Sequence, residues 1–242
     1  MLKMQNVTKS FDKVKVLNDL TLTVPKGAVY GLVGANGAGK STAIRLLMGI
    51  YRQDAGSITL EGKPVFEKLK AKRRMCCVPE EAFFFPSDTL EEMKKYYKGF
   101  YPCFDDALFD QLQDVFQLSE RACLLRCSQR IQKQAAFQLS ICSRPDVLIL
   151  DETLDGLEPE VRQQIGSLIL SEQEMTVLIA SHNLRDLDGI CDHIGVLDKG
   201  RMLWERSLDI LESDAEGKKQ TLEEILTYEL GGADYDIKNI LL

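Results

Sequence analysis

The chain lacks the sequence features of a membrane-spanning or exported protein. Its 242 residues contain no apolar run close to the length of a transmembrane helix, and no signal peptide stands at the start. Internal repeats and low-complexity segments are also missing. We therefore expect a globular chain that neither crosses a membrane nor is exported.

Metal-binding and disulfide patterns are missing too, although the chain has seven cysteines. The number is odd, Cys76 and Cys77 are adjacent, and neither a CxxC pair nor a Cys/His cluster has the spacing of a zinc site. We expect the cysteines to be small apolar core residues in a reducing compartment.

The chain has little basic charge relative to its acidic charge. It contains 30 Lys and Arg residues against 37 Asp and Glu residues, for a formal net charge of −7. Because an acidic surface repels a phosphate backbone, we expect no nucleic-acid partner. The length is sufficient to bury one full α/β core, with room for a subdomain.

Residues 34–42, with the sequence GANGAGKST, are the most informative stretch in the chain. They match G-x-x-x-x-G-K-[ST], and they stand between an apolar run at 28–33 that predicts a buried strand and a predicted helix at 41–48. Glycines let backbone N–H groups turn toward the phosphates, and the helix N-terminus adds its positive dipole end. The pattern indicates a nucleoside triphosphate site, with Gly34, Asn36, Gly37, Ala38, Gly39, Lys40, Ser41 and Thr42 as the expected binding residues.

The side chains of this site have distinct expected roles. Lys40 would reach the β- and γ-phosphates, and Ser41 would ligate Mg²⁺. The other half of the site is expected at Asp151 and Glu152, which end an apolar run at 147–150. At the carboxyl end of a strand buried on both faces, Asp151 would hold Mg²⁺ and Glu152 would polarise a water for in-line attack on the γ-phosphorus.

The rest of the pattern predicts an α/β fold. Alternating apolar and polar residues in 2–24 predict antiparallel strands before the phosphate-binding segment, and helical periodicity dominates from 89 to about 142. Short β-rich runs separated by helical segments predict a parallel, helix-covered sheet that ends in a hairpin at Gly200. These runs lie at 75–78, 147–150, 176–180 and 194–197.

The organisation that we predict has three parts. An ATPase core comprises residues 1–85 and 146–212, and an α-helical subdomain is inserted at 86–145. A charged C-terminal tail follows at 213–242, with one helix near 222–230.

With these motifs in place, nearly the whole chain resembles the ATP-binding cassette (ABC) family. The resemblance is carried further by GLEP at 156–159, by IASH at 179–182 and by a final hairpin at 191–201. It implies a P-loop NTPase with a RecA-like parallel-sheet core, an antiparallel β subdomain and the inserted α-helical subdomain.

The family also implies roles for two more residues. Phe11 stands where the family places an aromatic residue that stacks on adenine. His182 resembles the switch histidine that touches the γ-phosphate, where an imidazole donates to phosphate oxygens or orients the attacking water. The catalytic residues implied by the resemblance are Glu152, His182 and Lys40.

One family motif is degraded in this chain. The signature, LSGGQ or close to it, is expected at 127–131, where the chain reads CSQRI. Ser128 is retained, both glycines are lost, and Arg130 stands at the second of them. In the family this motif caps the γ-phosphate held by the other subunit of a head-to-tail dimer, with the serine and a helix N-terminus as donors.

Two hypotheses follow for Arg130. In the first, its side chain blocks the close approach that glycine allows, and the chain works best beside a different subunit with an intact signature. In the second, Arg130 reaches the trans γ-phosphate as a guanidinium donor, similar to an arginine finger. We favour the first, and the partner stays open between a second copy and a relative.

Smaller departures from the family occur near the active site. Glu80 replaces a glutamine after Pro79; its carboxylate can bind Mg²⁺ but cannot donate a hydrogen bond. Thr153 replaces a proline, and Glu158 replaces an aspartate. The sequence around Glu80 resembles bacterial exporters of the peptide-antibiotic type.

Three consecutive phenylalanines at 83–85 follow the segment around Glu80. In transporters of the family this region receives a short helix of the membrane subunit. Three adjacent side chains cannot all face one side of a regular element, so a docking groove and a subdomain core both stay open as interpretations. The charged residues Glu91, Glu92, Lys94 and Lys95 are expected on a solvated helix face.

The resemblance as a whole implies an ATP-binding and ATP-hydrolysing subunit of an ABC transporter that uses ATP and Mg²⁺. Its expected partners are a separate integral-membrane permease and a second ABC ATPase subunit, and its expected location is cytoplasmic, peripheral on the inner face of the cell membrane. The alternative is a soluble nucleotide-switched module with low turnover that acts in assembly or signalling. The transported substrate is set by the permease, so this sequence does not define it.

Overall fold

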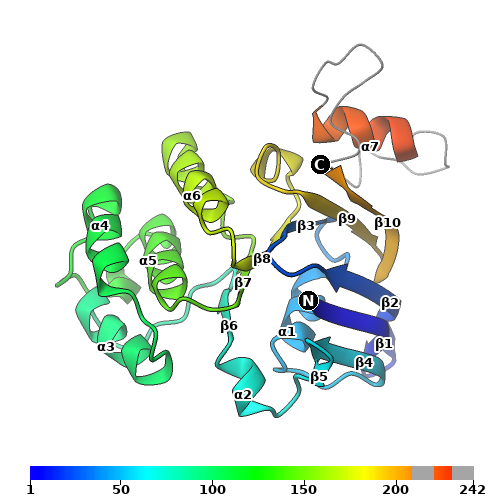
Figure 1. Cartoon of the computed structure of the whole chain (residues 1–242), viewed down its shortest axis with the longest axis horizontal. Helices are drawn as coiled ribbons and strands as arrows, with labels where there is room; N and C mark the ends of the chain where they lie inside the picture. Colours follow the sequence, from blue (N-terminus) through cyan, green and yellow to red (C-terminus); the bar gives the residue numbers. More distant parts are fainter. Residues whose placement is uncertain (209–220, 231–242) are drawn as a thin grey trace.

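The computed structural model describes residues 1–208 and 221–230, which form two sheets and a group of helices (Figure 1). In this part of the chain the larger sheet has six strands in the order β10-β9-β3-β8-β7-β6. They run parallel except for β10, which pairs antiparallel with β9 at one edge. The predicted α/β fold with a mostly parallel sheet is confirmed. The strands are β3 (Val29–Val33), β6 (Met75–Val78), β7 (Val147–Asp151), β8 (Thr176–Ser181), β9 (His193–Asp198) and β10 (Arg201–Ser207).

The central strands are buried on both faces, which explains why their sequences read as continuous apolar runs. In β7, Leu148 and Leu150 belong to one hydrophobic core, whereas Val147 and Ile149 belong to another. Successive side chains point to opposite faces of a strand, so the sheet is the wall between the two cores.

A smaller antiparallel sheet covers one face of the parallel sheet, and helix α1 (Lys40–Leu47) lies between them (Figure 1). The apolar side of α1, which includes Ile44 and Leu47, is buried in the core shared with both sheets. Each such side chain contributes about 1.5–3 kcal/mol by its burial. In the order β2-β1-β4-β5, the strands are β1 (Leu2–Phe11), β2 (Val14–Val24), β4 (Ala55–Leu60) and β5 (Lys63–Pro64).

Helices cover the opposite face and occupy the chain between β6 and β7. Helix α3 begins at a capping box, in which the Thr89 hydroxyl accepts from the Glu92 N–H and the Glu92 carboxylate accepts from the Thr89 N–H. Of these helices, α3 (Leu90–Phe100), α4 (Asp106–Phe116), the 3₁₀ turn η1 (Leu124–Arg126) and α5 (Gln129–Cys142) precede β7, and α6 (Pro159–Ser171) and the 3₁₀ turn η2 (Leu184–Asp186) follow it. The short helix α2 (Leu69–Lys72) precedes β6 and buries Ala71 in the core that contains α1.

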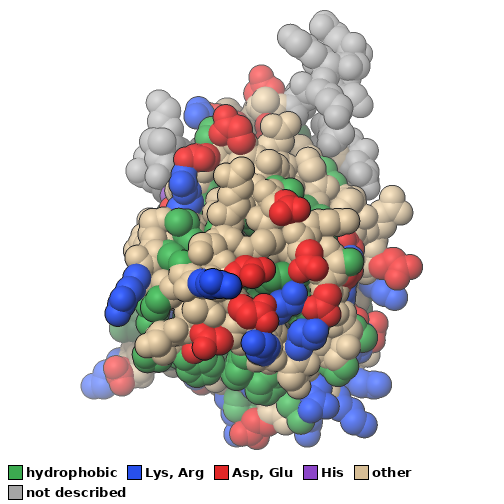
Figure 2. Space-filling model, turned by 90° about the vertical axis from the view of Figure 1, so that its left-hand side faces the viewer, with side chains coloured by type: hydrophobic (Ala, Val, Ile, Leu, Met, Phe, Trp, Pro, Cys, Tyr) green, Lys and Arg blue, Asp and Glu red, His purple; other side chains and the backbone are tan. Residues whose placement is uncertain are grey.

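Acidic and basic side chains lie interspersed on the face that the helices present (Figure 2). Lys94 of α3 pairs with Asp106 and Asp110 of α4 at 3.3 and 3.2 Å, and its ammonium lies 4.2 Å from the centre of the Phe109 ring. The prediction of a solvated face is wrong for Lys94, because its side chain is only 14% exposed and joins two helices.

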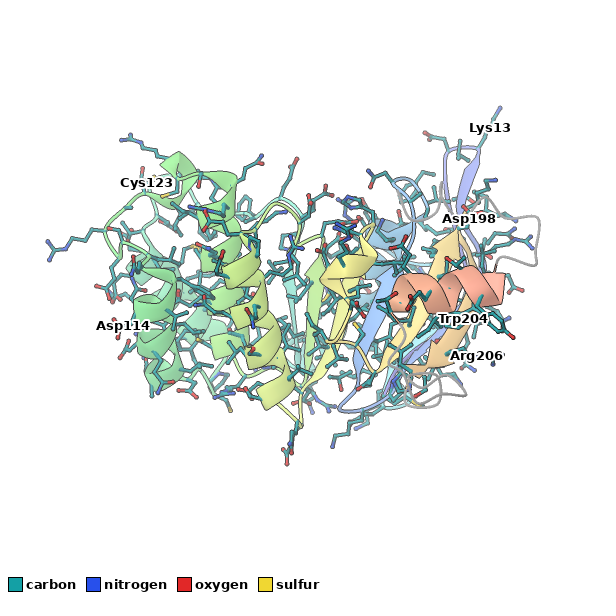
Figure 3. The ribbon with its side chains drawn as sticks, turned by 90° about the horizontal axis from the view of Figure 1, so that it is seen from above. Lys13, Asp114, Cys123, Asp198, Trp204 and Arg206 are labelled. Carbon is teal, nitrogen blue, oxygen red and sulfur yellow. The ribbon has the colours of Figure 1, made fainter. Side chains whose placement is uncertain are left out.

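Helix α7 (Leu222–Leu230) agrees with the helix predicted near 222–230. Its buried residues Leu222, Ile225 and Leu226 join the same core as Leu208. Figures 1 and 3 both show α7 beside the β9–β10 edge of the sheet, where Trp204 and Arg206 are labelled in Figure 3. The end of the predicted core (209–212) and the rest of the predicted tail (213–220 and 231–242) lie outside the described residues.

The cysteines are free thiols with mixed burial. Cys76, Cys142 and Cys191 are buried core residues as predicted. The prediction is wrong for Cys103, which is exposed, and it holds only in part for the half-buried Cys77, Cys123 and Cys127. Across residues 1–208 and 221–230, every helix is too short or too polar to cross a bilayer.

Candidate functional site

Three loops meet at the carboxyl edge of the parallel sheet. Strand β8 lies between β3 and β7, with Val33 opposite Ser181 and Ala180 opposite Asp151. The segments that follow the three strands therefore begin at the same level of the sheet, which is where open α/β sheets bind ligands. They carry the phosphate loop (residues 34–41), His182 and the 152–158 loop.

The phosphate loop turns tightly from β3 into α1. Gly39 is the residue before the helix and has φ 110°, a conformation that L side chains rarely adopt; a Cβ there would lie 2.7 Å from the Leu17 side chain. Of the other expected binding residues, Asn36 and Gly37 are exposed at the tip of the loop, Ala38 is buried, and Ser41 and Thr42 lie half-buried in the first turn of α1.

The expected catalytic side chains form one connected group. The Lys40 ammonium is 3.0 Å from Glu152 Oε1, and it donates to the Gly34 carbonyl at 2.6 Å. On the other side, His182 Nδ1 lies 2.8 Å from Glu152 Oε2, which also accepts from the His182 backbone N–H at 3.2 Å. The Glu152 carboxylate is thus held between a cation of the phosphate loop and the imidazole that follows β8.

Glu152 has an unusual backbone conformation. Its φ is 48°, in the left-handed region that non-glycine residues seldom occupy. The Glu152 N–H donates to the Ala180 carbonyl at 3.0 Å, which ties the residue to β8. Such conformations persist only where neighbouring contacts hold them, and they concentrate at functional sites.

Ser41, Asp151 and Glu80 are the residues predicted to hold a magnesium ion. Ser41 Oγ donates to Asp151 Oδ1 at 3.3 Å. Burial raises the pKa of Asp151 to about 6; the charges of Glu152 and Glu80 add to the rise, and the Ser41 hydrogen bond and the Lys40 charge oppose it. A cation would relieve this excess of negative charge, and hard divalent cations prefer carboxylate and hydroxyl oxygens.

Phe11 lies at the end of β1 with 38% of its surface exposed. Its ring meets Tyr51 edge-on at 5.2 Å between centroids, and the Lys9 ammonium lies 5.3 Å from its centre. The two rings form an aromatic surface that a base could stack against. Sequence reasoning missed Tyr51, because nothing local connects the end of β1 with the segment after α1.

The segment that we predict to be a degraded signature, residues 127–131, lies at the start of α5. Ser128 is the N-cap of this helix and accepts from the Ile131 N–H at 3.4 Å. The Arg130 guanidinium forms an ion pair with Glu158, the N-cap residue of α6. Among the described residues, the hydrogen bonds and ion pairs of Ser128 and Arg130 do not reach the Lys40–Glu152–His182 group.

A second residue that the sequence analysis missed is Lys133. Its ammonium donates to the backbone carbonyls of Glu152 and Asp155, each at 2.8 Å. These contacts depend on how α5 packs against the 152–158 loop, and the sequence carries no local signal for them.

An aromatic groove lies where α2, β6 and α3 meet, with a volume of about 420 Å³. Phe84 is buried in the core, as the core interpretation predicts, whereas Phe83 is 72% and Phe85 37% exposed, so the docking interpretation of these two stays a prediction. Phe85 contacts Tyr96 of α3 at 5.1 Å between ring centres. The groove is lined by Met48, Leu69, Lys72, Arg73, Cys76, Cys77, Pro79, Phe83, Phe85, Met93, Tyr96, Tyr97, Phe100, Tyr101 and Ala136.

Comparison with known proteins agrees with this geometry. The ABC transporter family model matches residues 17–155. The chain is 30% identical to the ABC transporter ATP-binding protein YtrB of Bacillus subtilis, with 88% of this chain and 74% of the relative covered. It is also 30% identical to the lantibiotic transport ATP-binding protein SrtF of Streptococcus pyogenes. That alignment covers 86% of this chain and 92% of SrtF.

Solved structures show the same fold. A structure described as the ATP binding subunit of an ABC transporter aligns with a TM-score of 0.82 at 24% identity, covering 96% of this chain and 99% of that one. At this identity the likeness speaks for the fold alone.

Proposed function

The chain belongs to the ABC transporter family as an ATP-binding ATPase cassette, and on that premise we propose how its residues use ATP and which partners it drives. The observation that carries the proposal is the convergence of Lys40, Glu152 and His182 within hydrogen-bonding distance at the carboxyl edge of the sheet. A positive group from the phosphate loop can stabilise the charge of a transferring phosphoryl group, and a carboxylate or an imidazole can orient the attacking water.

Nucleotide would be bound by the loop amides and by an aromatic surface. The N–H groups of the phosphate loop and the N-terminus of α1 would hold the phosphates. Lys40 would exchange its contact with Glu152 for the β- and γ-phosphates. Phe11 would stack on adenine, with Tyr51 bracing its ring.

Ser41, Asp151 and Glu80 would hold Mg²⁺. When bound, this ion would screen the negative charge of the phosphates. The Ser41–Asp151 hydrogen bond supports the first two residues, and Glu80 is included because its charge contributes to the raised pKa of Asp151.

Hydrolysis would depend on the release of Glu152. Without nucleotide, its carboxylate is engaged by both Lys40 and His182. Once the γ-phosphate attracts Lys40, Glu152 is free to accept a proton from the attacking water. His182, still adjacent, would donate to the γ-phosphate or orient that water.

A second cassette would complete the site, and a relative with an intact signature is the favoured partner. Ser128 is available as a helix-capping hydroxyl, but the neighbouring Arg130 is already paired with Glu158 of its own chain. To contact a trans γ-phosphate, Arg130 would first have to leave that carboxylate. Because both side chains are exposed, this pair is weak and is given up at little cost. The blocked cap is favoured instead because both glycines of the signature are replaced.

The partner that does transport would be a separate membrane permease, with the cassette working at the inner face of the membrane. The aromatic groove offers a docking site, since exposed Phe83 and Phe85 give it an apolar rim that water disfavours. Charged Lys72 and Arg73 stand on the same rim.

Affinity purification of the tagged chain from detergent-solubilised native membranes tests this proposal. We expect an integral-membrane protein to co-purify and the complex to hydrolyse ATP. With Phe83→Ser, the membrane protein should no longer co-purify with the tagged chain. With Tyr228→Ser, which changes an aromatic residue 85% exposed on α7, it should still co-purify. Recovery of an ATP-binding chain with no membrane partner would favour a nucleotide-switched module instead.

A further inference from the structure

Helix α5 presents two basic side chains to the 152–158 loop, which joins β7 to α6. Arg130 and Lys133 are three residues apart and share a face of the helix. Arg130 pairs with Glu158 at the far end of the loop, and Lys133 binds the carbonyls of Glu152 and Asp155 at its start. Figure 1 shows α5 and α6 together on the same side of β7.

The two contacts differ in strength. Arg130 and Glu158 are 41% and 57% exposed, and an ion pair in that setting is screened by water. Lys133 is half-buried and makes two charge-assisted hydrogen bonds of 2.8 Å to backbone oxygens. The Lys133 contact is therefore the one that fixes the loop.

Lys133 acts on the most constrained residue of the site. Glu152 has φ 48°, its N–H is held by the Ala180 carbonyl of β8, and its own carbonyl is held by Lys133. Both peptide groups that flank its Cα are therefore fixed, one by the sheet and one by α5. The direction of the carboxylate toward Lys40 and His182 follows from the orientation of these two peptides.

We infer that Lys133 is a positioning residue for ATP hydrolysis: it holds the backbone of Glu152 in the left-handed conformation that points its carboxylate into the site. This inference rests on the proposed role of Glu152. It also gives the helical layer a direct mechanical link to the active site, because a shift of α5 would pull the Glu152 carbonyl with it.

Three variants of the full chain test the inference, by kcat and KM for ATP, ATP affinity and melting temperature. Lys133→Met keeps the apolar stem and should lower kcat by about 10- to 100-fold, since small misplacements of a reacting group have effects of that size. Its ATP affinity and KM should stay within about two-fold, because Lys133 touches no group of the phosphate loop. Lys133→Arg should restore most of the activity. Lys95→Met, on the exposed face of α3, is the matched control and should behave as the wild type.

Amide hydrogen exchange of the 150–158 segment gives a readout that needs no hydrolysis. Lys133→Met should raise exchange there by at least about 10-fold relative to the wild type and to Lys95→Met, since the Glu152 N–H bond to Ala180 would open more often. Unchanged kcat or unchanged exchange in Lys133→Met would overturn the inference, as would equal losses of ATP affinity and kcat. A wild-type chain that hydrolyses no ATP, even with its partners, would instead contradict the proposed function, and the exchange result would still decide the role of Lys133.

Discussion

At the scale of single residues, the Lys40–Glu152 contact is a buried ion pair within the site. The two side chains are only 5% and 7% exposed, and their charged atoms are 3.0 Å apart. Removing one partner of a buried ion pair leaves an uncompensated charge, which is far more costly than losing a surface pair. With the proposed role of Lys40 in binding the phosphates, the stability of the chain and its affinity for ATP would depend on the same lysine.

Substitution of Lys40 by methionine tests this coupling. We expect Lys40→Met to lower the free energy of unfolding by about 3 kcal/mol, because Glu152 remains buried without its cation. The double variant Lys40→Met/Glu152→Gln should recover about half of that loss, since the uncompensated charge is then gone. Urea denaturation at neutral pH measures both values. A double variant no more stable than Lys40→Met would show that the pair is not the source of the loss.

Residues whose role depends on local sequence were predictable, and those that depend on packing were not. Lys40 and Ser41 follow from a contiguous motif, and Asp151 from its place at the end of a buried strand. Lys133 and Tyr51 contact the site only because α5 and the segment after α1 pack where they do, and no spacing in the sequence encodes that.

At the scale of elements, helix α4 shows how a helix terminus is tied to the rest of the molecule. Its N-cap, Asp105, accepts from the Leu108 N–H at 2.9 Å and binds the Arg144 guanidinium at 2.7 Å. The backbone hydrogen bond, followed by the Arg144 interaction, lowers the pKa of Asp105 below its ordinary value. Arg144 stands two residues after the end of α5, so one carboxylate caps α4 and joins it to α5.

Stability should depend on this carboxylate and on pH. We expect Asp105→Ala to lower the free energy of unfolding by about 1–2 kcal/mol at pH 7, and Asp105→Asn by less, since asparagine still caps. A lowered pKa means that the charged form stabilises the fold above the unfolded pKa, near 4, and that this contribution is lost as pH falls through the folded value. Denaturation at several pH values should show the gap between wild type and Asp105→Asn closing in acid. A gap that widens toward low pH would contradict the assignment.

The types of the elements, helix or strand, were largely predictable because apolar residues recur with different periods in the two. Continuous apolar runs identified the parallel strands, and helical spacing identified the 89–142 region. The burial of Lys94 could not be predicted in this way. A charged residue on an amphipathic helix is expected in solvent until the neighbouring helix that buries it is known. The same limit applies to the phenylalanines at 83–85, whose burial alternates within a loop.

At the scale of the whole molecule, the open question is how the chain pairs with a second cassette. The site at the carboxyl edge has its own cation, carboxylate and imidazole, but the signature at the start of α5 has lost both glycines. Arg130 projects from the first turn of that helix and pairs with Glu158 across the loop. The proposed pairing with a second cassette therefore depends on Arg130 and on the two lost glycines.

The most direct test of the account is the mass of Glu152→Gln protein with and without Mg·ATP, measured by light scattering on a sizing column, beside the variant Arg130→Gly/Glu152→Gln. The glutamine slows hydrolysis and should trap any closed dimer. We predict that Glu152→Gln binds ATP and stays a monomer, whereas the double variant becomes a dimer in ATP, because glycine again allows the close approach. An ATP-dependent dimer of Glu152→Gln with Arg130 intact would contradict the blocked-cap account.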